Sequence, residues 1–422
     1  YIGGGYGAKP KPSGTLIGGN GTVTISGGTI TEASGGYMAA GIGSGFQGLG
    51  TVTIEGDAVI KNAQGGEAGA GIGSGTRGNS EIIIRGDAVI ENAESSANGA
   101  GIGSGQGDLY LDGDGMVIDP TVGNVTIEGN AKIENAKSGY GGSGIGGGTV
   151  GIGNVIIRGN AQIGNATGGE EGAGIGGGAL GTGDVTIEGN VTIKNAKGGA
   201  GAAGIGGGAE TQPDTEDTRN KVSIKSTEAG SPNITAKGGG VLNNEEAPLP
   251  GAAAIGSGSV ADGATEVKSD ITVEGKVTID ATGGGDVAIG DSINGETRFS
   301  GLQVGTTITR RNAKGDDVSQ PGDVVREQTP TETEAAEVPS EVERPVTVEG
   351  LYVTNVLGKQ ITHTCTQNGT TLTIRANGIV TSAHLTLGMV RTLKAQGVKT
   401  LVFTTLLSRS TTVSVDALLA AA

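Results

Sequence analysis

The first group of residues with a spacing that could do chemistry lies in the stretch GDLYLDGDGMVID. It contains four aspartates, whose carboxylates are hard oxygen ligands: Asp108, Asp112, Asp114 and Asp119. The Asp-Gly-Asp-Gly run matches part of a calcium-binding loop, but it lacks the terminal bidentate Glu and the full alternate spacing. Asp and Gly are also typical of a protruding turn. Residues 107–120 are therefore either a partial calcium site or a turn, and we expect no other cofactor.

Nucleophilic and acid–base chemistry has weaker candidates. Both histidines, His363 and His384, lie near the end of the chain, and Cys365 follows two residues after His363 on one predicted strand. Nothing marks that His and Cys as a catalytic pair, since no third group is placed to organise them. A glycoside hydrolase would need two paired carboxylates, whereas most acidic residues here recur in alternation with basic ones. We therefore expect that the chain is not an enzyme.

The composition narrows the class of protein. Glycine accounts for 87 of 422 residues, Trp is absent and Phe occurs three times, so a repeated core of small residues is favoured over a compact globule. The net charge of −16 disfavours nucleic acid and anionic membrane surfaces as partners. The single cysteine excludes an intrachain disulfide. No apolar run is long enough to span a bilayer, so we expect no membrane insertion.

A repeated sequence accounts for the high glycine content. Residues 50–75, GTVTIEGDAVIKNAQGGEAGAGIGSG, recur with drift about every thirty residues from residue 21 to about residue 295. Each copy predicts three short strands, which in this copy cover residues 51–55, 58–62 and 70–74. Well-kept copies fill residues 21–208, and looser copies fill residues 221–315. The predicted fold is all-β: a parallel β-helix of about eight rungs with three strands per rung, for which a right-handed coil is favoured.

One position alternates in charge from copy to copy. It directly follows the isoleucine of the first strand and reads Ser26, Glu55, Arg85, Glu128, Arg158, Glu188, Lys225 and Glu274. Acid and base placed opposite each other on neighbouring strands stabilise the pair, whereas like charges there are unfavourable. The alternation therefore predicts that consecutive copies stack in register, with these residues as a structural ladder.

Alternation along the strands predicts which side chains point inward. Two columns of isoleucine fall there, one containing Ile54 and the other Ile72. An asparagine column falls at the inward end of the second strand: Asn62, Asn92, Asn135, Asn165 and Asn195. A row of ligand sites is one interpretation of this column. Stacked amides that bond from rung to rung are the favoured one.

The third strand of each copy has glycine at its outward positions. These residues include Gly71, Gly73, Gly101, Gly103, Gly144, Gly146, Gly174 and Gly176. Glycine within a strand often marks the close approach of another backbone or a ligand. We therefore predict either a bare contact face for a partner or an adaptation to the curvature of a tight coil.

The pattern ends near residue 315. Residues 316–344 are rich in Pro, Glu and Thr and predict a solvated linker. Residues 345–422 predict a small α+β module with strands at 345–353, 360–366, 370–375, 398–406 and 411–415. A helix is expected over residues 382–396, with Ser382 as its N-cap. The chain opens at Tyr1, and residues 2–5 (IGGG) match the end of a repeat, so we expect a trimmed chain that starts partway round a turn.

The motifs VTI(E/R)G, (A/V)xIxNA and GAGIGGG in residues 21–258 resemble glycine-rich β-helix repeats in surface and secreted proteins of Gram-positive anaerobic bacteria. The stretches MVRTLKAQGVKTLVF and TTVSVDALL are similar to a small domain found in such proteins. The resemblance implies an extracellular adhesin, stalk or polysaccharide binder. Our first hypothesis is a structural rod, either a filament subunit that associates head to tail or laterally with itself, or an adhesin stalk on a host or cell-wall surface. The alternative is a polysaccharide-binding module that uses the glycine face or residues 107–120.

Overall fold

The structure is a computed structural model. It describes residues 2–3, 19–112, 115–210, 219–241, 251–259, 269–291, 298–320, 322–325, 344–378, 380–405 and 410–420. The chain divides into two compact units, Tyr1–Thr329 and Pro330–Ala422. In the part that is described, no helix is long and apolar enough to cross a membrane.

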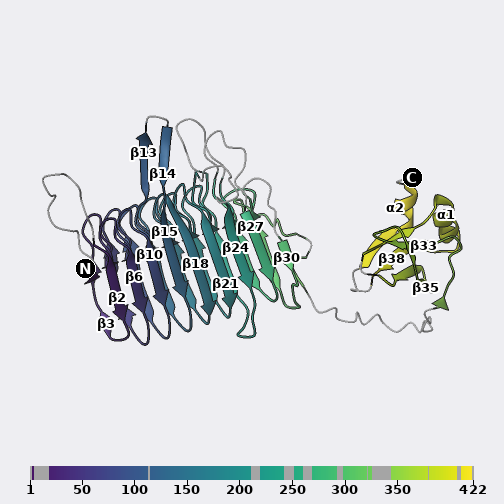
Figure 1. Cartoon of the computed structure of the whole chain (residues 1–422), viewed down its shortest axis with the longest axis horizontal. Coiled ribbons are helices and arrows are strands. Elements are labelled where there is room, and N and C mark those ends of the chain that lie inside the picture. Colours follow the sequence, from purple (N-terminus) through teal and green to yellow (C-terminus); the bar gives the residue numbers. More distant parts are fainter. Residues whose placement is uncertain are drawn as a thin grey trace. The chain divides into compact units, whose positions relative to one another are not determined.

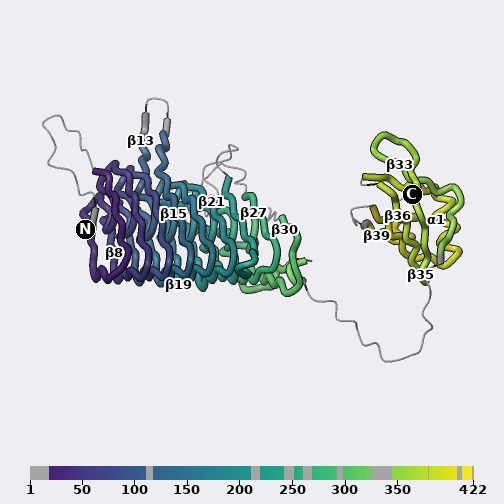
Figure 2. Tube along the Cα trace, turned by 60° about the horizontal axis from the view of Figure 1, so that its bottom comes forward, coloured from purple at the N-terminus to yellow at the C-terminus, as the bar shows by residue number. Residues whose placement is uncertain are grey.

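The first unit is a solenoid built from three parallel sheets, and its rungs stack along one axis (Figures 1 and 2). Sheet 1 holds the first strand of each repeat. Its order is β2 (Gly21–Ile25), β6 (Gly50–Ile54), β10 (Ser80–Ile84), β15 (Thr121–Ile127), β18 (Gly151–Gly159), β21 (Gly183–Gly189), β24 (Asn220–Lys225), β27 (Ser269–Glu274) and β30 (Arg298–Ser300).

Sheet 2 holds the second strands. Its order is β3 (Thr29–Ile30), β7 (Val59–Ile60), β11 (Val89–Ser95), β16 (Lys132–Lys137), β19 (Gln162–Thr167), β22 (Thr192–Lys197), β25 (Asn233–Lys237), β28 (Thr278–Thr282) and β31 (Thr307–Arg311). In the first rungs the second strand is split, and its later halves are β4 (Ala33–Ser34) and β8 (Ala63–Gly65).

Sheet 3 holds the third strands, which are two residues long. Its order is β1 (Ile2–Gly3), β5 (Ile42–Gly43), β9 (Ile72–Gly73), β12 (Ile102–Gly103), β17 (Ile145–Gly146), β20 (Ile175–Gly176), β23 (Ile205–Gly206), β26 (Ile255–Gly256) and β29 (Ile289–Gly290). Ile2 pairs with Ile42 and Gly3 with Gly43, so the match to the end of a repeat is confirmed for residues 2–3, and residues 4–5 lie outside the described residues. The predicted parallel β-helix and its stacking in register are also confirmed.

Columns of identical side chains form the core of the solenoid. The isoleucines of the third strands, Ile42, Ile72, Ile102, Ile145, Ile175, Ile205 and Ile255, are all fully buried. Those of the first strands are buried from Ile54 to Ile224, and Ile25 at the N-terminal end is partly covered. Each isoleucine pairs with its equivalent in the next rung, as Ile145 does with Ile175. The core is therefore thin and is filled by Ile, Val and Ala without large aromatic side chains.

The solenoid continues past the predicted boundary at residue 315. Residues 316–325, apart from residue 321, fold back along β31, and Thr307 and Arg311 form antiparallel bridges with Val324 and Asp317. The guanidinium of Arg310 forms two hydrogen bonds, 2.9 and 3.0 Å long, with the Asp323 carboxylate, and both side chains are almost fully buried. This part of the predicted linker is therefore wrong: it is an end cap. Residues 326–343 lie outside the described residues.

The second unit contains a five-stranded sheet, a three-stranded sheet and two short helices. The larger sheet has the order β32 (Arg344–Pro345), β35 (His363–Asn368), β36 (Thr371–Ala376), β38 (Thr400–Thr404) and β39 (Ser410–Ser414). The smaller sheet has the order β34 (Gln360–Ile361), β33 (Tyr352–Asn355) and β37 (Thr381–His384). The helices are α1 (Leu387–Ala395) and α2 (Val415–Ala420), so the predicted small α+β module is confirmed.

The predicted start of the helix in this unit is wrong. Ser382 lies in β37, where it pairs with Thr354. The N-cap is Thr386, whose hydroxyl accepts a hydrogen bond from the backbone N–H of Met389. Pairing of residues 381–384 with β33 outweighs their capping preference, because tertiary contacts override a weak local preference. Gly397 follows the helix with a φ of +85°, as expected for the residue that ends it.

Candidate functional site

The charge ladder lies on the outer face of sheet 1. Arg85 lies 2.6 Å from the Glu55 carboxylate and Arg158 lies 2.6 Å from that of Glu128, each with a second hydrogen bond of 2.8 Å. Further along, the Lys225 ammonium is 3.3 Å from Glu274. Strand pairing places Glu188 directly between Arg158 and Lys225. The predicted alternation is confirmed, and each exposed pair contributes at most about 1 kcal/mol.

The asparagine column forms a ladder of amides. Asn135 donates to Asn92 over 3.1 Å, Asn165 donates to Asn135 over 2.9 Å, and Asn195 donates to Asn165 over 3.2 Å. These side chains are half-buried or exposed, so the predicted inward position, which included Asn62, is wrong. The chain bends at residue 61, and Ala63, the residue after Asn62, is buried in place of that asparagine. The stacked-amide interpretation is confirmed.

Sequence reasoning missed two further ladders. One runs along the turn after the first strand: Asn130 donates to Asp87, Asn160 to Asn130, and Asn190 to Asn160, with distances of 2.9 to 3.1 Å. The other lies on sheet 1, where Asn124 donates to Glu81 over 2.5 Å and Asn154 donates to Asn124 over 2.9 Å. The recurrence of Asn or Asp at equivalent positions was the available signal for both.

The predicted glycine contact face is wrong, because these glycines are buried inside the coil. A Cβ on Gly73 would lie 1.9 Å from the carbonyl oxygen of Gly103, and one on Gly71 would lie 2.6 Å from that of Gly101. Gly101, Gly103, Gly144, Gly146, Gly174 and Gly176 meet the backbone of the next rung in the same way. The approaching backbone is therefore that of the chain itself.

The predicted calcium ligands lie on a protruding hairpin of β13 (Asp108–Asp112) and β14 (Gly115–Asp119), shown in Figures 1 and 2. Asp108 pairs with Asp119 at its base, and Asp108 lies 2.6 Å from Arg77. Asp112 is at the other end of β13, about 13 Å away along an extended strand, so one calcium loop cannot include both. Asp114 lies outside the described residues, among which no group of three potential ligands could hold a metal ion. Asp108 and Asp112 therefore do not belong to one calcium loop, and calcium binding by the other aspartates stays a prediction.

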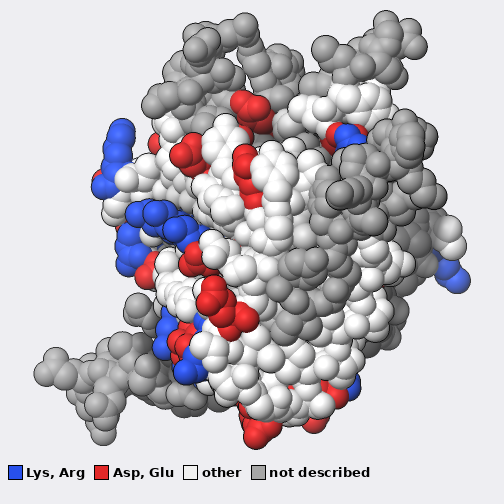
Figure 3. All heavy atoms as spheres, turned by 90° about the vertical axis from the view of Figure 1, so that its left-hand side faces the viewer, with Lys and Arg blue, Asp and Glu red and all other residues white. Residues whose placement is uncertain are grey.

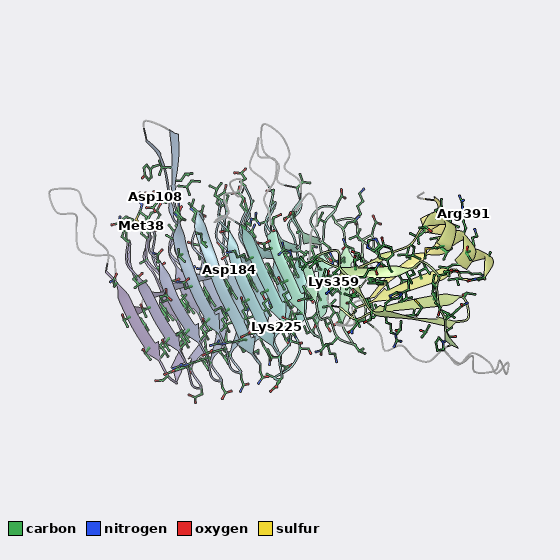
Figure 4. The ribbon with its side chains drawn as sticks, turned by 45° about the vertical axis from the view of Figure 1, so that its right-hand side comes forward. Met38, Asp108, Asp184, Lys225, Lys359 and Arg391 are labelled. Atoms are coloured by element: carbon green, nitrogen blue, oxygen red, sulfur yellow. The ribbon has the colours of Figure 1, made fainter. Side chains whose placement is uncertain are left out.

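A shallow groove of about 400 Å³ runs across the outer face of sheet 1. One wall is the row Glu81, Asn124, Asn154 and Asp184, and the other contains Thr126, Ile156 and Thr186. Figure 4 places Asp184 and Lys225 over this sheet and Asp108 at the base of the hairpin. Carboxylates, amides and hydroxyls repeated at the rung spacing can form hydrogen bonds with an elongated polar ligand.

Charges of both signs lie side by side on the N-terminal side of the solenoid, which Figure 3 shows. An acidic group occurs farther along, where burial, Glu210 and Glu170 raise the pKa of the Glu171 carboxyl. Glu171 in turn is the main cause of the raised pKa of Tyr140. Both directions follow from unfavourable charge in a partly desolvated place.

The His and Cys candidates lie on one strand, β35, of the second unit. Cys365 is buried, and burial raises the pKa of its thiol, so the reactive thiolate is disfavoured. His384 instead stacks on Tyr352, with ring centroids 4.5 Å apart, and its Nε2 lies 2.8 Å from the Thr354 hydroxyl. These contacts hold the ring of His384 on the three-stranded sheet, away from β35.

The comparisons leave the family open. No family model, no curated protein and no solved structure matches the chain. What the architecture supports is a β-solenoid joined to a small α+β unit.

Proposed function

We propose that the chain is a non-catalytic extracellular structural protein whose solenoid acts as a stalk. The observation that carries this proposal is the in-register stacking of three sheets over the whole solenoid. At the strand spacing of about 4.8 Å, nine stacked strands give a rod roughly 40 Å long. Neighbouring rungs are joined by backbone, amide and charge ladders, so bending the rod would break many contacts at once. An extracellular location rests on the resemblance of the repeats.

The end cap favours a stalk over a filament. The segment 316–325 supplies hydrogen bonds to β31: the N–H of Ile308 donates to the Asp323 carbonyl and the N–H of Val318 donates to that of Arg310. Partly buried Phe299, Leu302 and Val318 cover the end of the core. An edge that is already paired offers no template for the first rung of another copy. Head-to-tail growth through this end is therefore disfavoured.

Sedimentation and electron microscopy of the whole chain test the proposal. We expect monomers at every concentration, each with one straight rod of the stated length. Fibres formed without denaturant would contradict the stalk and support the filament. Hydrolysis or transfer activity lost on substitution of a single solenoid residue would contradict a non-catalytic role.

The second candidate function is polysaccharide binding in the groove on sheet 1. Its row of Glu81, Asn124, Asn154 and Asp184 provides donors and acceptors along the rod axis. A pull-down on insoluble plant and cell-wall polysaccharides tests it, with Asn154→Leu as the variant that blocks the groove and Lys61→Ala, in the bend after β7, as the control. Retention that Asn154→Leu abolishes would support this function, and no retention on any polysaccharide would reject it.

A further inference from the structure

The β13–β14 hairpin is an insertion that the solenoid does not need. Equivalent residues of neighbouring rungs are 30 apart, but Glu81 and its partner Asn124 are 43 apart. Thr121 and Val122 already pair with Gly151 and Ile152 of the next rung. Removal of residues 108–120 would restore the 30-residue spacing without a shift in register. The hairpin therefore has to be explained by something other than packing of the coil.

The base of the hairpin is held firmly. The buried Thr121 hydroxyl donates to the Gly105 carbonyl over 2.8 Å and lies 3.0 Å from the hydroxyl of Ser104. On the other side, Arg77 lies over the ring of Phe46 and forms an ion pair with Asp108. Arg77 has a φ of +59°, an uncommon conformation for a residue with a side chain. Gln47, Val150 and Leu180 take the same conformation in other rungs, so it belongs to this turn of the coil and not to the hairpin.

Above this base, the hairpin exposes apolar side chains on both faces. Leu109 is opposite Ile118, and Tyr110 is opposite Val117. Leu109 and Tyr110, both on β13, are 45% and 47% exposed, whereas Val117 and Ile118 are half-buried. Among the described strands, β13 pairs only with β14, so its outer edge is open. An isolated two-stranded hairpin is marginally stable in water, and a third strand would stabilise it.

The negative charge of the hairpin indicates which kind of partner could bind beside it. Residues 107–120 contain four aspartates and no lysine or arginine. A second copy of the hairpin or an anionic lipid surface would be repelled, whereas a basic chain would be attracted. An open strand edge is recognised by main-chain hydrogen bonds from an extended peptide. Asp108 and Tyr110 point to one face of β13 and Leu109 to the other, so lysines of such a peptide would lie beside Asp108 and Tyr110, while its apolar residues would cover Leu109.

We propose that β13 is a docking edge for an extended segment of another protein in which basic and apolar residues alternate. The segment adds as a third strand beside Leu109 and Tyr110. This inference goes beyond a stalk, because it gives the rod a lateral binding site for a protein partner, and it does not depend on the stalk being correct.

A fluorescent synthetic peptide of alternating lysine and valine is the probe, and fluorescence anisotropy with the whole chain is the measurement. We expect saturable binding that is lost on deletion of residues 108–120. Tyr110→Lys and the pair Asp108→Asn with Asp119→Asn should each weaken binding about tenfold, the loss expected for one good contact. High salt should weaken it as well.

Two controls separate strand addition from attraction to an acidic protein. Asp57→Asn with Asp286→Asn removes the same charge elsewhere on the solenoid and should leave binding unchanged. A peptide N-methylated at every residue keeps its charge but cannot donate backbone hydrogen bonds from either edge, and it should not bind. The deletion variant must have the same melting temperature as the unmodified chain. If it does not, the binding of the peptide to the Tyr110→Lys variant tests the proposal instead. Binding that survives both the deletion and N-methylation, no binding at all, or retention of a polysaccharide by the hairpin instead would overturn the proposal.

Discussion

The solenoid and the C-terminal unit solve the same packing problem in different ways. In the solenoid, buried glycines bring the backbones of neighbouring rungs together, and a Cβ on Gly73 or Gly103 would overlap the next rung. In the C-terminal unit, larger side chains such as Leu372, Leu393 and Leu401 fill one core between sheet and helix. Glycines there, such as Gly358, lie in open turns. Packing in the solenoid is thus limited by contacts between backbones, and packing in the C-terminal unit is limited by contacts between side chains.

The largest expected effect is that of Gly73→Ala. The substitution would force the Cβ into the Gly103 carbonyl at a φ of +138°, and we expect a loss of more than about 4 kcal/mol of unfolding free energy. Gly358→Ala in the C-terminal unit is the matched control, since its φ is +75° but its surroundings are open; about 1–2 kcal/mol should be lost. Urea denaturation measures both. Equal losses would contradict the backbone limit.

Asp323→Ala should have the next largest effect on stability, because it leaves the buried guanidinium of Arg310 without its partner. We expect a loss of about 3–5 kcal/mol and, since the edge of β31 is then uncovered, concentration-dependent association in sedimentation. In the C-terminal unit, Lys394→Ala breaks an exposed pair with Asp416 and should cost less than about 1 kcal/mol. A stable, monomeric Asp323→Ala protein would show that the segment is not a cap.

Ile102→Ala and Leu372→Ala compare the two cores directly. Both residues are fully buried, and each truncation should cost about 2–5 kcal/mol. In the solenoid a rung contacts only its neighbours, so the faster amide hydrogen exchange should stay within nearby rungs. In the C-terminal unit the acceleration should spread over the whole core. Uniform acceleration along the solenoid would mean that it unfolds as one cooperative unit.

Asn135→Ala should have a smaller effect, about 1–2 kcal/mol, because it removes an amide that bonds both Asn92 and Asn165. The C-terminal unit has no such ladder among its described residues. A double-mutant cycle with Asn165→Ala measures the coupling between rungs. Lys137→Ala, an exposed neighbour, is the control. Strictly additive effects would mean that the amides do not act as a ladder.

The smallest effect concerns pH. The pKa of Glu171 is raised in the folded chain, so the folded state binds this proton more tightly than the unfolded state does. Stability should therefore rise as the pH falls from neutrality towards the ordinary carboxyl pKa, over the range between the folded and unfolded values. Glu171→Gln should be more stable than the unmodified chain at neutral pH and should flatten this dependence. Thermal melting at several pH values measures it; a steeper dependence in the variant would refute the assignment.

The sequence predicted those features of the fold that follow from its thirty-residue repeat. Repetition of Ile54, Ile72 and the Glu55–Arg85 alternation was enough to assign the sheets, the register and two core columns. Asn62 was placed wrongly because the strand bends there, and alternation holds only along an unbroken strand. The repeated glycines, such as Gly73, indicated a close approach, but they did not tell whether the approaching backbone was that of a partner or of the chain itself.

The repeat pattern could not predict the end cap or the hairpin, because neither segment belongs to the repeat. Residues 316–325 have the composition of a linker, and only the long-range partner Arg310 reveals the role of Asp323. For the hairpin, Asp108 and Asp112 looked like neighbours in a loop, but they lie at opposite ends of the extended strand β13. Both errors come from reading local composition where a contact distant in sequence decides the structure.

The insertion of the hairpin has a wider consequence. An ideal Cβ on Gly107 would lie 3.2 Å from the backbone nitrogen of Thr121, so the chain leaves and rejoins the coil at almost the same point. The spacing between hydrogen-bonded partners of adjacent rungs is 43 residues there and 37 between Gly183 and Asn220, while the sheets keep their order. The corner after the third strand is therefore a graft site: a foreign loop or small domain with closely spaced ends could be displayed there, at a chosen height along the rod.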